Sequence, residues 1–442
     1  MLNILIATFG SLGDLHPCLM LGQGLKARGH HVTLATDPFY RARVEATGLA
    51  FAPIRPALNF DDEALQRRVL DPRWGSKVII NDIFMPAIVE TYTDILPYMQ
   101  AADLYINAPL TAGGMLAAEV TKTPWVGTVL TPMSLMSTTD PPTITAFPYP
   151  NWVHQLPHAF KVPLFQGLYR GFDAVSQPWL KPYHRLRQSL GLPAKANPLF
   201  AGQFSPWLNL ALLSPVLAPP QPDWPQSQQG LLEATGFLYT DSPHWADEHP
   251  ESAARLTAFL AAGPPPIVFT LGSSAVNCPG EFYQTSAAVC HRLGERGILL
   301  AGQHAPALAE QFAARNDLLV MDYAPHALVF PQAAVVVHQG GVGTTAQGLR
   351  AGVPQLVVPF GFDQPDNARR VVGLGAGETL GPCQYSLSNA EQRLRLLLSE
   401  PSYQHRAKLV AEAIAQEDGL NSACNKIERL LQVVYSQASN LN

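Results

Sequence analysis

Residues 335–367, VVVHQGGVGTTAQGLRAGVPQLVVPFGFDQPDN, constrain the fold of this chain more than any other stretch. An apolar run leads to a histidine, a glycine-rich turn, the start of a helix, a second apolar run and an Asp-Gln pair. This order predicts two parallel strands joined by a helix. Amides at the start of a helix lack partners within it and carry the positive end of its dipole, so the turn is expected to bind a phosphate group.

The turn supplies a set of candidate ligands for that anion. The imidazole of His338 is predicted to donate a hydrogen bond, although a histidine at a strand end can also be an ordinary core residue. Glycines allow a close approach of the backbone, and the residues after them add amides and hydroxyls. The predicted cradle comprises His338, Gly340, Gly341, Val342, Gly343, Thr344 and Thr345.

Asp363 and Gln364 follow the second strand, with Gln364 lying 26 positions after His338 (364 − 338). In a parallel sheet both sites return to the same edge, where ligands collect. A carboxylate and an amide beside a phosphate cradle suggest a nucleotide-sugar, whose hydroxyls Asp363 and Gln364 would bind with help from Asn367. The alternative is that Asp363 only caps a helix that starts near Pro365.

This stretch resembles the donor-binding signature of the family 1 nucleotide-sugar glycosyltransferases. The opening FGSLGDLHPCLMLGQGLKARGHHVTLAT and the later IVFTLGSS extend the resemblance over most of the chain. Among subgroups it most resembles the bacterial rhamnosyltransferases and the sterol and antibiotic glucosyltransferases, which share the GD-x-x-P opening and the HxGGxGT form. The resemblance implies the α/β GT-B fold, in which two Rossmann-like domains with parallel sheets face each other across a cleft.

Composition sets the broad class. A chain of 442 residues favours two domains of about 200 residues each. With 47% hydrophobic and 14% charged residues, a large core is expected and disorder is not. The net charge of −5, without a basic run, argues against a nucleic-acid partner.

The cysteines and the apolar segments bear on where in the cell the protein is expected to lie. Five scattered cysteines without a C-x-x-C spacing favour reduced thiols and a cytoplasmic protein. The opening MLNILIATFG resembles a first strand and not a signal peptide. No apolar run reaches the roughly 18 residues that span a bilayer, so any membrane contact is expected to be peripheral.

The chain is predicted to divide into an acceptor-binding domain at 1–215, a proline-rich linker at 216–230 and a donor-binding domain at 231–420. The resemblance implies that a last helix, within 421–442, packs back on the first domain. Pro17 is expected at the first position of the first helix, and Ser388 is expected to cap a helix at 389–399. Strands are predicted at 3–8, 32–36, 104–107, 124–130, 266–271, 297–300, 318–321, 333–337 and 355–358.

The turn after the first strand carries the predicted catalytic group. Asp14 is proposed as the base that takes a proton from the acceptor hydroxyl, with Gly13 beside it and His16 as the second candidate. A helix cap is the alternative role for Asp14. Plant-type members of the family pair a histidine with an aspartate from a later strand, and Asn107 stands near that place here, so the resemblance implies that the usual dyad is absent.

Residues 132–198 form an insertion rich in proline and aromatic side chains. Long insertions in compact α/β domains are more often functional than idle. Phe147 and Trp152 are predicted to line a pocket for a small hydrophobic acceptor. The alternative is that these aromatic residues form the ordinary core of the insertion.

Three further segments are assigned to the donor through the resemblance. Ser273 and Ser274 are expected to touch the phosphates, unless they merely start a helix. Tyr323 and His326 occupy the base-stacking segment, where an aromatic residue could equally belong to the core. Ala346 replaces a glutamate that grips the ribose in plant enzymes, which is compatible with a deoxyribose donor.

No metal or other cofactor is expected, because a helix N-terminus can neutralise the diphosphate and the nucleotide-sugar, linked to UDP or dTDP, is a co-substrate. The acidic run 61–63 resembles a solvated surface segment more than a metal site.

These features predict an inverting hexosyltransferase that moves glucose, rhamnose or a related sugar to a hydroxyl of a small hydrophobic acceptor. A catalytically silent nucleotide-sugar-binding or partner-activating protein of the same fold is one alternative. A nucleotide-sugar epimerase or hydrolase is another. A dinucleotide oxidoreductase is disfavoured, because the opening loop is not G-x-G-x-x-G.

Overall fold

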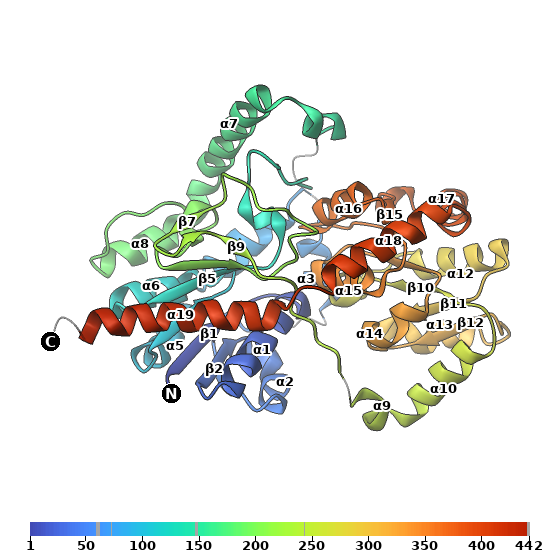
Figure 1. Cartoon of the computed structure of the whole chain (residues 1–442), viewed down its shortest axis with the longest axis horizontal. Helices are drawn as coiled ribbons and strands as arrows, with labels where there is room; N and C mark the ends of the chain where they lie inside the picture. Colours follow the sequence, from blue (N-terminus) through green and yellow to red (C-terminus); the bar gives the residue numbers. More distant parts are fainter. Residues whose placement is uncertain (59–61, 72, 146–148, 243, 440–442) are drawn as a thin grey trace. The chain divides into compact units, whose positions relative to one another are not determined.

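The computed structural model describes residues 1–58, 62–71, 73–145, 149–242 and 244–439 (Figure 1). The chain forms two compact units. Unit 1 comprises Met1–Phe60, Arg73–Leu238 and Glu417–Asn442, and unit 2 comprises Asp61–Pro72 and Tyr239–Gln416.

Unit 1 contains a seven-stranded sheet in the order β3-β2-β1-β4-β5-β6-β9. Each neighbouring pair in this sheet is parallel. Its strands are β1 (Asn3–Ala7), β2 (His31–Thr36), β3 (Ala50–Pro53), β4 (Leu104–Asn107), β5 (Trp125–Val129), β6 (Leu208–Ala211) and β9 (Glu233–Ala234). Nearly every residue of β1, β4 and β5 is buried, as expected when helices cover both faces of a parallel sheet.

Unit 2 contains a six-stranded parallel sheet in the order β12-β11-β10-β13-β14-β15. Its strands are β10 (Ile267–Thr270), β11 (Gly297–Leu300), β12 (Leu318–Met321), β13 (Val335–His338), β14 (Gln355–Val357) and β15 (Gly377–Thr379). The predicted α/β class with two parallel sheets is confirmed.

Each sheet reverses its strand order once. The chain moves outward from β1 to β3 and then returns to β4 on the other side of β1. In the second sheet it moves outward from β10 to β12 and returns to β13 beside β10. Ligands of open α/β sheets bind at such switch points, beyond the carboxyl ends of the strands. The turns after β1, β4, β10 and β13 are therefore the places to look for a site.

The predicted linker is wrong, because residues 216–230 lie inside unit 1. Strand β9 follows this segment and pairs with β6, so the chain stays with the first sheet until Leu238. Two short strands, β7 (Gln226–Ser227) and β8 (Gly230–Leu231), form a hairpin at the end of the segment.

Two predicted helix starts are also wrong. Helix α1 (Leu12–Ala27) begins five residues before Pro17 (17 − 12), because Ser11 and Asp14 form a reciprocal capping box that starts it earlier. Helix α17 (Leu387–Ser399) is capped by the hydroxyl of Ser386, which accepts from the amide of Asn389.

The last helix, α19 (Gly419–Ser439), belongs to unit 1 and packs on α1 (Figure 1). Gly24 of α1 allows this contact, since a Cβ there would lie 2.8 Å from Cδ1 of Leu420 and 3.1 Å from Sγ of Cys424. An ion pair between Arg28 Nη1 and Glu428 Oε2, 2.7 Å apart, flanks the contact.

The insertion forms helices instead of extending the sheet. Its regular elements are η3 (Pro132–Leu135), η4 (Asn151–Gln155), α7 (His158–Ser176), η5 (Gln177–Leu180) and α8 (Lys181–Ser189). Among the described residues, no helix combines the length and apolarity needed to cross a bilayer.

Candidate functional site

The turns after β10 and β13 meet at the switch point of the second sheet. Thr270 and His338 are direct neighbours at the ends of these strands. A Cβ on Gly272, where φ is +60°, would lie 2.2 Å from Nε2 of Gln339. Only glycine permits this approach, so Gly272 brings the two turns together.

The imidazole of His338 is fully buried and has protein partners on both nitrogens. Its Nδ1 accepts from the amide of Gly340 at 3.0 Å, so the ring proton sits on Nε2 and is donated to Oε1 of Gln355 at 2.8 Å. Burial lowers the pKa of His338 to about 4, and the ring is neutral near pH 7. The imidazole therefore fixes the turn, and a direct bond from His338 to an anion stays a prediction that would require Nε2 to leave Gln355.

The amides that follow are open. Helix α15 (Val342–Ala351) has Gly341 as its N-cap, and glycine has no side chain with which to cap the helix. Among the described residues, no group accepts from the amides of Val342, Gly343 and Thr344. Gly343 is exposed and no atom lies within 4 Å of where its Cβ would be. The start of α15 thus offers three amide donors and free space to an anion.

Unsatisfied buried polar atoms gather around this helix start. Oε1 of Gln339, Oγ1 of Thr345 and Oδ1 of Asn367 find no hydrogen-bond partner in the described part of the chain. A buried polar atom without a partner costs about 1–3 kcal/mol, so this site is suited to a ligand or ordered water. Gln339 was not among the predicted site residues, although it lies inside the glycine-rich motif that predicted the turn.

The Asp-Gln pair lies against the same turn. A Cβ on Gly340, where φ is +89°, would lie 2.6 Å from Cγ1 of Val357 and 3.1 Å from the carbonyl oxygen of Gln364. The side-chain amide of Asn367 donates to the Gly340 carbonyl at 2.9 Å and to Oδ2 of Asp363 at 2.8 Å. The predicted return to one edge of the sheet is found.

The side chains of Asp363 and Gln364 differ in their hydrogen bonds to the neighbouring backbone. Asp363 stands at the N-cap of α16 (Gln364–Gly373) but makes no side-chain cap bond, so capping does not account for its carboxylate. Oε1 of Gln364 accepts from the amides of Phe360 at 2.7 Å and Gly361 at 3.1 Å and is committed to that loop. Contact of either residue with sugar hydroxyls stays a prediction.

The other predicted donor residues surround the switch point less closely. Ser273 is exposed in α11 (Gly272–Ala275), directly after β10, whereas the side chain of Ser274 lies outside the described residues. Tyr323 follows β12 and is 50% exposed. His326 stacks on Phe330 with ring centroids 4.4 Å apart and serves at least as a packing residue.

In unit 1, the turn after β1 presents Asp14. One carboxylate oxygen, Oδ2, accepts from the amide of Ser11 at 2.9 Å and from its hydroxyl at 3.3 Å. Gly10, with φ at +130°, permits this geometry, because a Cβ there would lie 2.3 Å from that oxygen. The capping role is therefore real, yet no described residue donates to Oδ1.

Burial raises the pKa of Asp14 to about 6, against the hydrogen bonds from Ser11, which act in the opposite direction. An aspartate with such a pKa is a better proton acceptor near neutral pH than one in water. For His16, burial and to a lesser extent the charge of Arg43 lower the pKa to about 4. The amide of Gly13 is bound to the hydroxyl of Ser11 at 3.2 Å.

Asn107 ends β4 and is the direct neighbour of Ala7 in β1, which places it on the edge that carries the Asp14 turn. Its Oδ1 accepts from the hydroxyls of Tyr105 at 2.8 Å and Thr111 at 2.7 Å. Because the carbonyl is held by two donors, the Nδ2 amide is the group left for a ligand.

The predicted contacts of an acceptor with two aromatic side chains stay a prediction. Phe147 lies outside the described residues, and Trp152 in η4 is 60% exposed. The buried Phe165 packs between two half-buried tyrosines, with ring centroids 5.2 Å from Tyr149 and 5.8 Å from Tyr169. For these residues the interpretation as an ordinary core holds.

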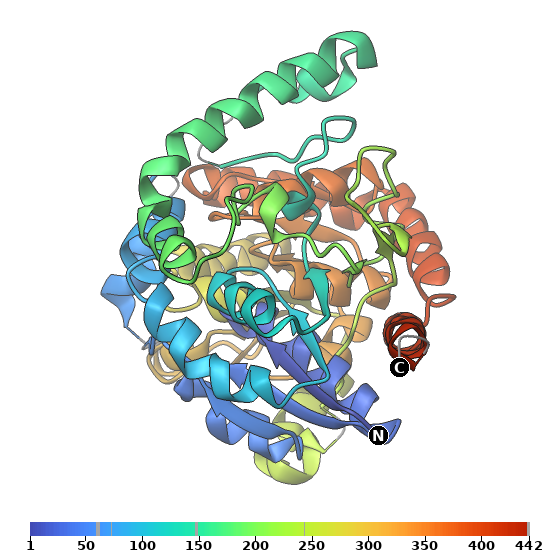
Figure 2. The ribbon, with the colours of Figure 1, turned by 90° about the vertical axis from the view of Figure 1, so that its left-hand side faces the viewer.

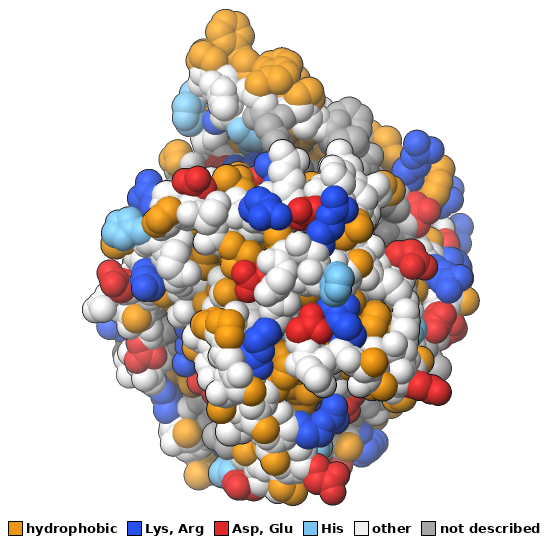
Figure 3. All heavy atoms as spheres, turned by 90° about the vertical axis from the view of Figure 1, so that its right-hand side faces the viewer, with side chains coloured by type: hydrophobic (Ala, Val, Ile, Leu, Met, Phe, Trp, Pro, Cys, Tyr) orange, Lys and Arg blue, Asp and Glu red, His pale blue; other side chains and the backbone are white. Residues whose placement is uncertain are grey.

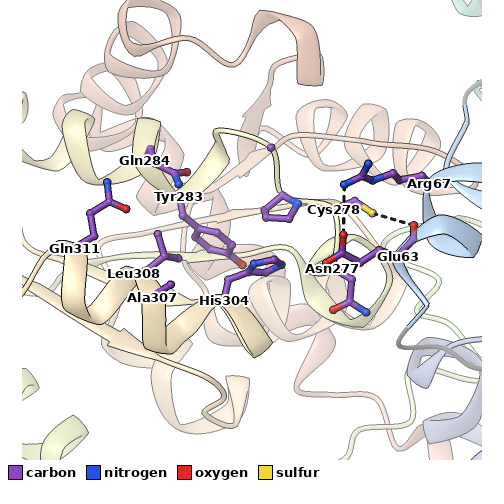
Figure 4. A pocket seen from close by; sticks show the side chains of 12 residues that line it. Glu63, Arg67, Asn277, Cys278, Tyr283, Gln284, His304, Ala307, Leu308 and Gln311 are labelled. Atoms are coloured by element: carbon purple, nitrogen blue, oxygen red, sulfur yellow. Dashed lines mark hydrogen bonds and ion pairs between the residues drawn. The ribbon is translucent and has the colours of Figure 1, made fainter.

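Unit 2 also has a pocket of about 530 Å³ between α3 (Glu63–Val69), the loop 277–280, α12 (Phe282–Leu293) and α13 (Ala305–Gln311) (Figure 4). None of the predicted site residues lines it. Asp62 caps α3 and Glu63 pairs with Arg67, so the acidic run has structural partners. Within the described ranges, no group of three or more metal-binding side chains is present.

Two domain families match the chain. The family described as "Glycosyltransferase family 28 N-terminal domain" covers residues 4–133, and the family described as "Erythromycin biosynthesis protein CIII-like, C-terminal domain" covers residues 297–428. These spans hold the Asp14 turn and the α15 cradle.

Proteins that align with the whole chain are also glycosyltransferases. The O-mycaminosyltylonolide 6-deoxyallosyltransferase of Streptomyces fradiae is 31% identical, and the alignment covers 97% of both chains. Sterol 3-beta-glucosyltransferase UGT80A2 of Arabidopsis thaliana is 27% identical over 96% of this chain and 64% of its own length. Among solved structures, the calicheamicin glycosyltransferase CalG4 matches with a TM-score of 0.70 at 17% identity, covering 98% of both chains.

Two parallel-sheet units, each with polar residues at its switch point, define the architecture that these glycosyltransferases share. The chain belongs to the GT-B glycosyltransferases, with a family 28 N-terminal domain and an erythromycin CIII-like C-terminal domain, and is related to the antibiotic and sterol enzymes. The predicted family is confirmed.

Proposed function

We propose that this glycosyltransferase transfers a hexose or deoxyhexose, with inversion, from a dTDP- or UDP-sugar to a hydroxyl of a small hydrophobic acceptor. The observation that carries the proposal is the open start of α15. There the amides of Val342, Gly343 and Thr344, which have no acceptor among the described residues, stand beside buried polar atoms that likewise lack partners.

The α15 start accounts for the donor half of the reaction. Negative charge grows on the diphosphate as the bond from its oxygen to the anomeric carbon breaks. Amides fixed at a helix N-terminus stabilise that charge without having to reorganise. His338 contributes by holding Gly340 in place, and Asp363 with Asn367 forms the neighbouring polar wall for sugar hydroxyls.

We propose that the donor is a dTDP-sugar in preference to a UDP-sugar. At the position where plant relatives carry a ribose-binding glutamate, Ala346 is buried and offers no polar group. A deoxyribose lacks the 2′-hydroxyl and needs no such partner. The spinosyn rhamnosyltransferase SpnG, whose fold is similar with a TM-score of 0.61 at 17% identity and which covers 97% of this chain and all of its own, was solved with thymidine diphosphate.

Asp14 is proposed as the general base. Its Oδ1 accepts the proton of the acceptor hydroxyl while that oxygen bonds to the anomeric carbon, and the nucleoside diphosphate leaves with the electron pair. The raised pKa of Asp14 suits this role. Oδ2 stays bound to Ser11, which keeps the carboxylate in one orientation.

The acceptor class rests on the relatives. The names of the Streptomyces fradiae and Arabidopsis thaliana proteins specify O-mycaminosyltylonolide and a sterol as acceptors. We infer a mostly apolar, hydroxylated acceptor of the same character.

The test is a product assay that crosses dTDP-glucose, dTDP-rhamnose and UDP-glucose with a macrolactone and a sterol, followed by mass spectrometry. The expected result is a product heavier by one sugar residue with one donor and one acceptor. Asp14→Asn should abolish turnover while the nucleotide still binds. Free sugar without an acceptor would indicate a hydrolase, and binding without turnover on any acceptor would indicate a silent binding protein.

A further inference from the structure

Helix α7 carries an exposed apolar face that the proposed reaction does not use. At 1.5 Å per residue its 19 residues extend about 28 Å. In Figures 1 and 2 this helix rises from the body of unit 1, and in Figure 3 hydrophobic side chains gather on the projection at the top. Phe160 is 67%, Leu164 51% and Val175 64% exposed.

The exposed face is continuous along the helix. At 100° per residue, every position within a sector about 120° wide is apolar or glycine, and each of these residues is exposed. We call this sector the α7 face, and it comprises Phe160, Pro163, Leu164, Gly167, Gly171, Ala174 and Val175.

The opposite side of the helix is anchored. Phe165 is buried against Tyr149, the hydroxyl of Tyr169 donates to the carbonyl of Ser137 at 2.9 Å, and Nζ of Lys161 donates to the carbonyl of His154 at 3.3 Å. The core therefore fixes which side of α7 is free. Gly167 and Gly171 have no atom within 4 Å of a Cβ position, so packing inside the unit does not require the small residues of the α7 face.

Trp152 is a further large apolar side chain of the insertion that is exposed. It precedes α7 in η4 and is 60% exposed. Tryptophan and phenylalanine beside an apolar helix face are typical of segments that lie in the boundary between lipid head groups and acyl chains. Contiguous apolar surfaces of this kind on a folded protein mark an interaction site.

Charge favours an anionic lipid over a neutral partner. Residues 149–190 hold five basic residues and one acidic residue, but Lys161 and Arg187 are buried and Arg187 pairs with Glu119, so three basic side chains remain for a membrane surface. Arg170, which borders the α7 face, is exposed, as are Lys181 and Arg185 of α8. Each exposed cation near an anionic membrane adds about 1 kcal/mol to binding.

Size disfavours a second copy of the chain as the occupant. A stable protein interface needs about 800 Å² from each partner. A strip about 28 Å long and one helix, about 10 Å, wide offers roughly 300 Å². That area is too small for a lasting dimer but suits reversible insertion of a few side chains into a membrane surface.

We propose that the α7 face, together with Trp152, docks this enzyme on an anionic lipid surface. Insertion buries Phe160 and Leu164 among the acyl chains, and Arg170 remains at the head groups. The docking does not depend on which sugar or acceptor the enzyme uses.

The test is co-sedimentation of the full chain with sucrose-loaded vesicles of phosphatidylcholine containing about 30% phosphatidylglycerol, with pure phosphatidylcholine for comparison. The wild type should bind the anionic vesicles, and high salt should weaken the binding. The F160S/L164S variant should bind about tenfold less or weaker still. Leu409→Ser on α18 (Pro401–Ile414), where the leucine is 42% exposed, is the matched control and should bind as the wild type does.

A second measurement guards against a folding defect in the double variant. Lipids brominated on their acyl chains should quench tryptophan fluorescence of the wild type, and Trp152→Phe should lose most of that quenching. The proposal is overturned if the wild type does not sediment with anionic vesicles, if F160S/L164S sediments equally, or if light scattering shows a dimer that the same double substitution abolishes.

Discussion

Single backbone positions decide whether an anion can reach the start of α15. Gly340 and Gly343 are three residues apart but differ in their surroundings. Gly340 has φ at +89° and close neighbours in Val357 and Gln364, whereas Gly343 has open space. The first glycine is therefore required by the fold, and the second is free to serve a ligand.

The pair Gly340→Ala and Gly343→Ala separates these roles. Gly340→Ala should lower the free energy of unfolding by about 2 kcal/mol or more, since both φ and the neighbouring atoms oppose a Cβ. Gly343→Ala should leave stability unchanged or raise it by up to about 1 kcal/mol, because alanine favours the helix. The measurement is chemical denaturation of both variants.

The same pair should differ in binding. Gly343→Ala should weaken dTDP binding by roughly 10- to 100-fold, because the added methyl group would keep the phosphate from its full approach to the amides. Calorimetric titration of the two variants measures this. Wild-type affinity in Gly343→Ala would mean that the phosphate lies elsewhere.

Asp14 sets the expected pH dependence. Its carboxylate can accept a proton only when ionised, and its pKa is about 6, so kcat/KM should be level above that pH and fall about tenfold per unit below it. His16 and His338, with pKa values of about 4, stay neutral through this range. A pH–rate profile of the wild type and His16→Gln should therefore show the same acidic limb near pH 6. A limb near pH 4 would point to another base.

At the scale of helices and strands, the buried strands were the predictable part. Strands β4, β11 and β12 have the bounds that their apolar runs indicated, because a strand covered on both faces is apolar throughout. Helix starts were harder. The capping box at Ser11 outweighs the preference of Pro17 for a first turn, and Ser386 is chosen over Ser388 by contacts that no local pattern reveals.

For the candidate donor site, the position of the turns was predictable from the sequence, but the hydrogen bonds between side chains were not. Sequence placed the glycine turn and the Asp-Gln pair on one edge, since topology alone brings them there. The sequence could not show that the Nε2 of His338 is hydrogen-bonded to Gln355. Gln355 lies on the neighbouring strand β14, and its position beside His338 depends on the register between the two strands.

Helix α19 provides a test of packing at this scale. Leu430 is fully buried in the core shared with α1, whereas Val433 of the same helix is 37% exposed. Leu430→Ala should cost about 2–4 kcal/mol of stability by leaving a cavity. Val433→Ala should cost less than about 0.5 kcal/mol. Thermal unfolding compares the two, and equal losses would contradict the packing described here.

For the whole molecule, the two units divide the chemistry. Unit 1 holds the proposed base, Asp14, and unit 2 holds the proposed diphosphate cradle at α15. If both proposals hold, neither unit alone has the base and the cradle, and turnover should require the intact chain. The chain enters unit 2 twice, at Asp61–Pro72 and at Tyr239–Gln416, and ends in unit 1.

A crystal structure of the full chain with dTDP tests the central claim most directly. The account predicts diphosphate oxygens about 2.7–3.2 Å from the backbone nitrogens of Gly343 and Thr344, with the His338 ring still bound to Gln355. A nucleotide seated in another place, such as the pocket beside α12 and α13, with the α15 amides untouched, would contradict it.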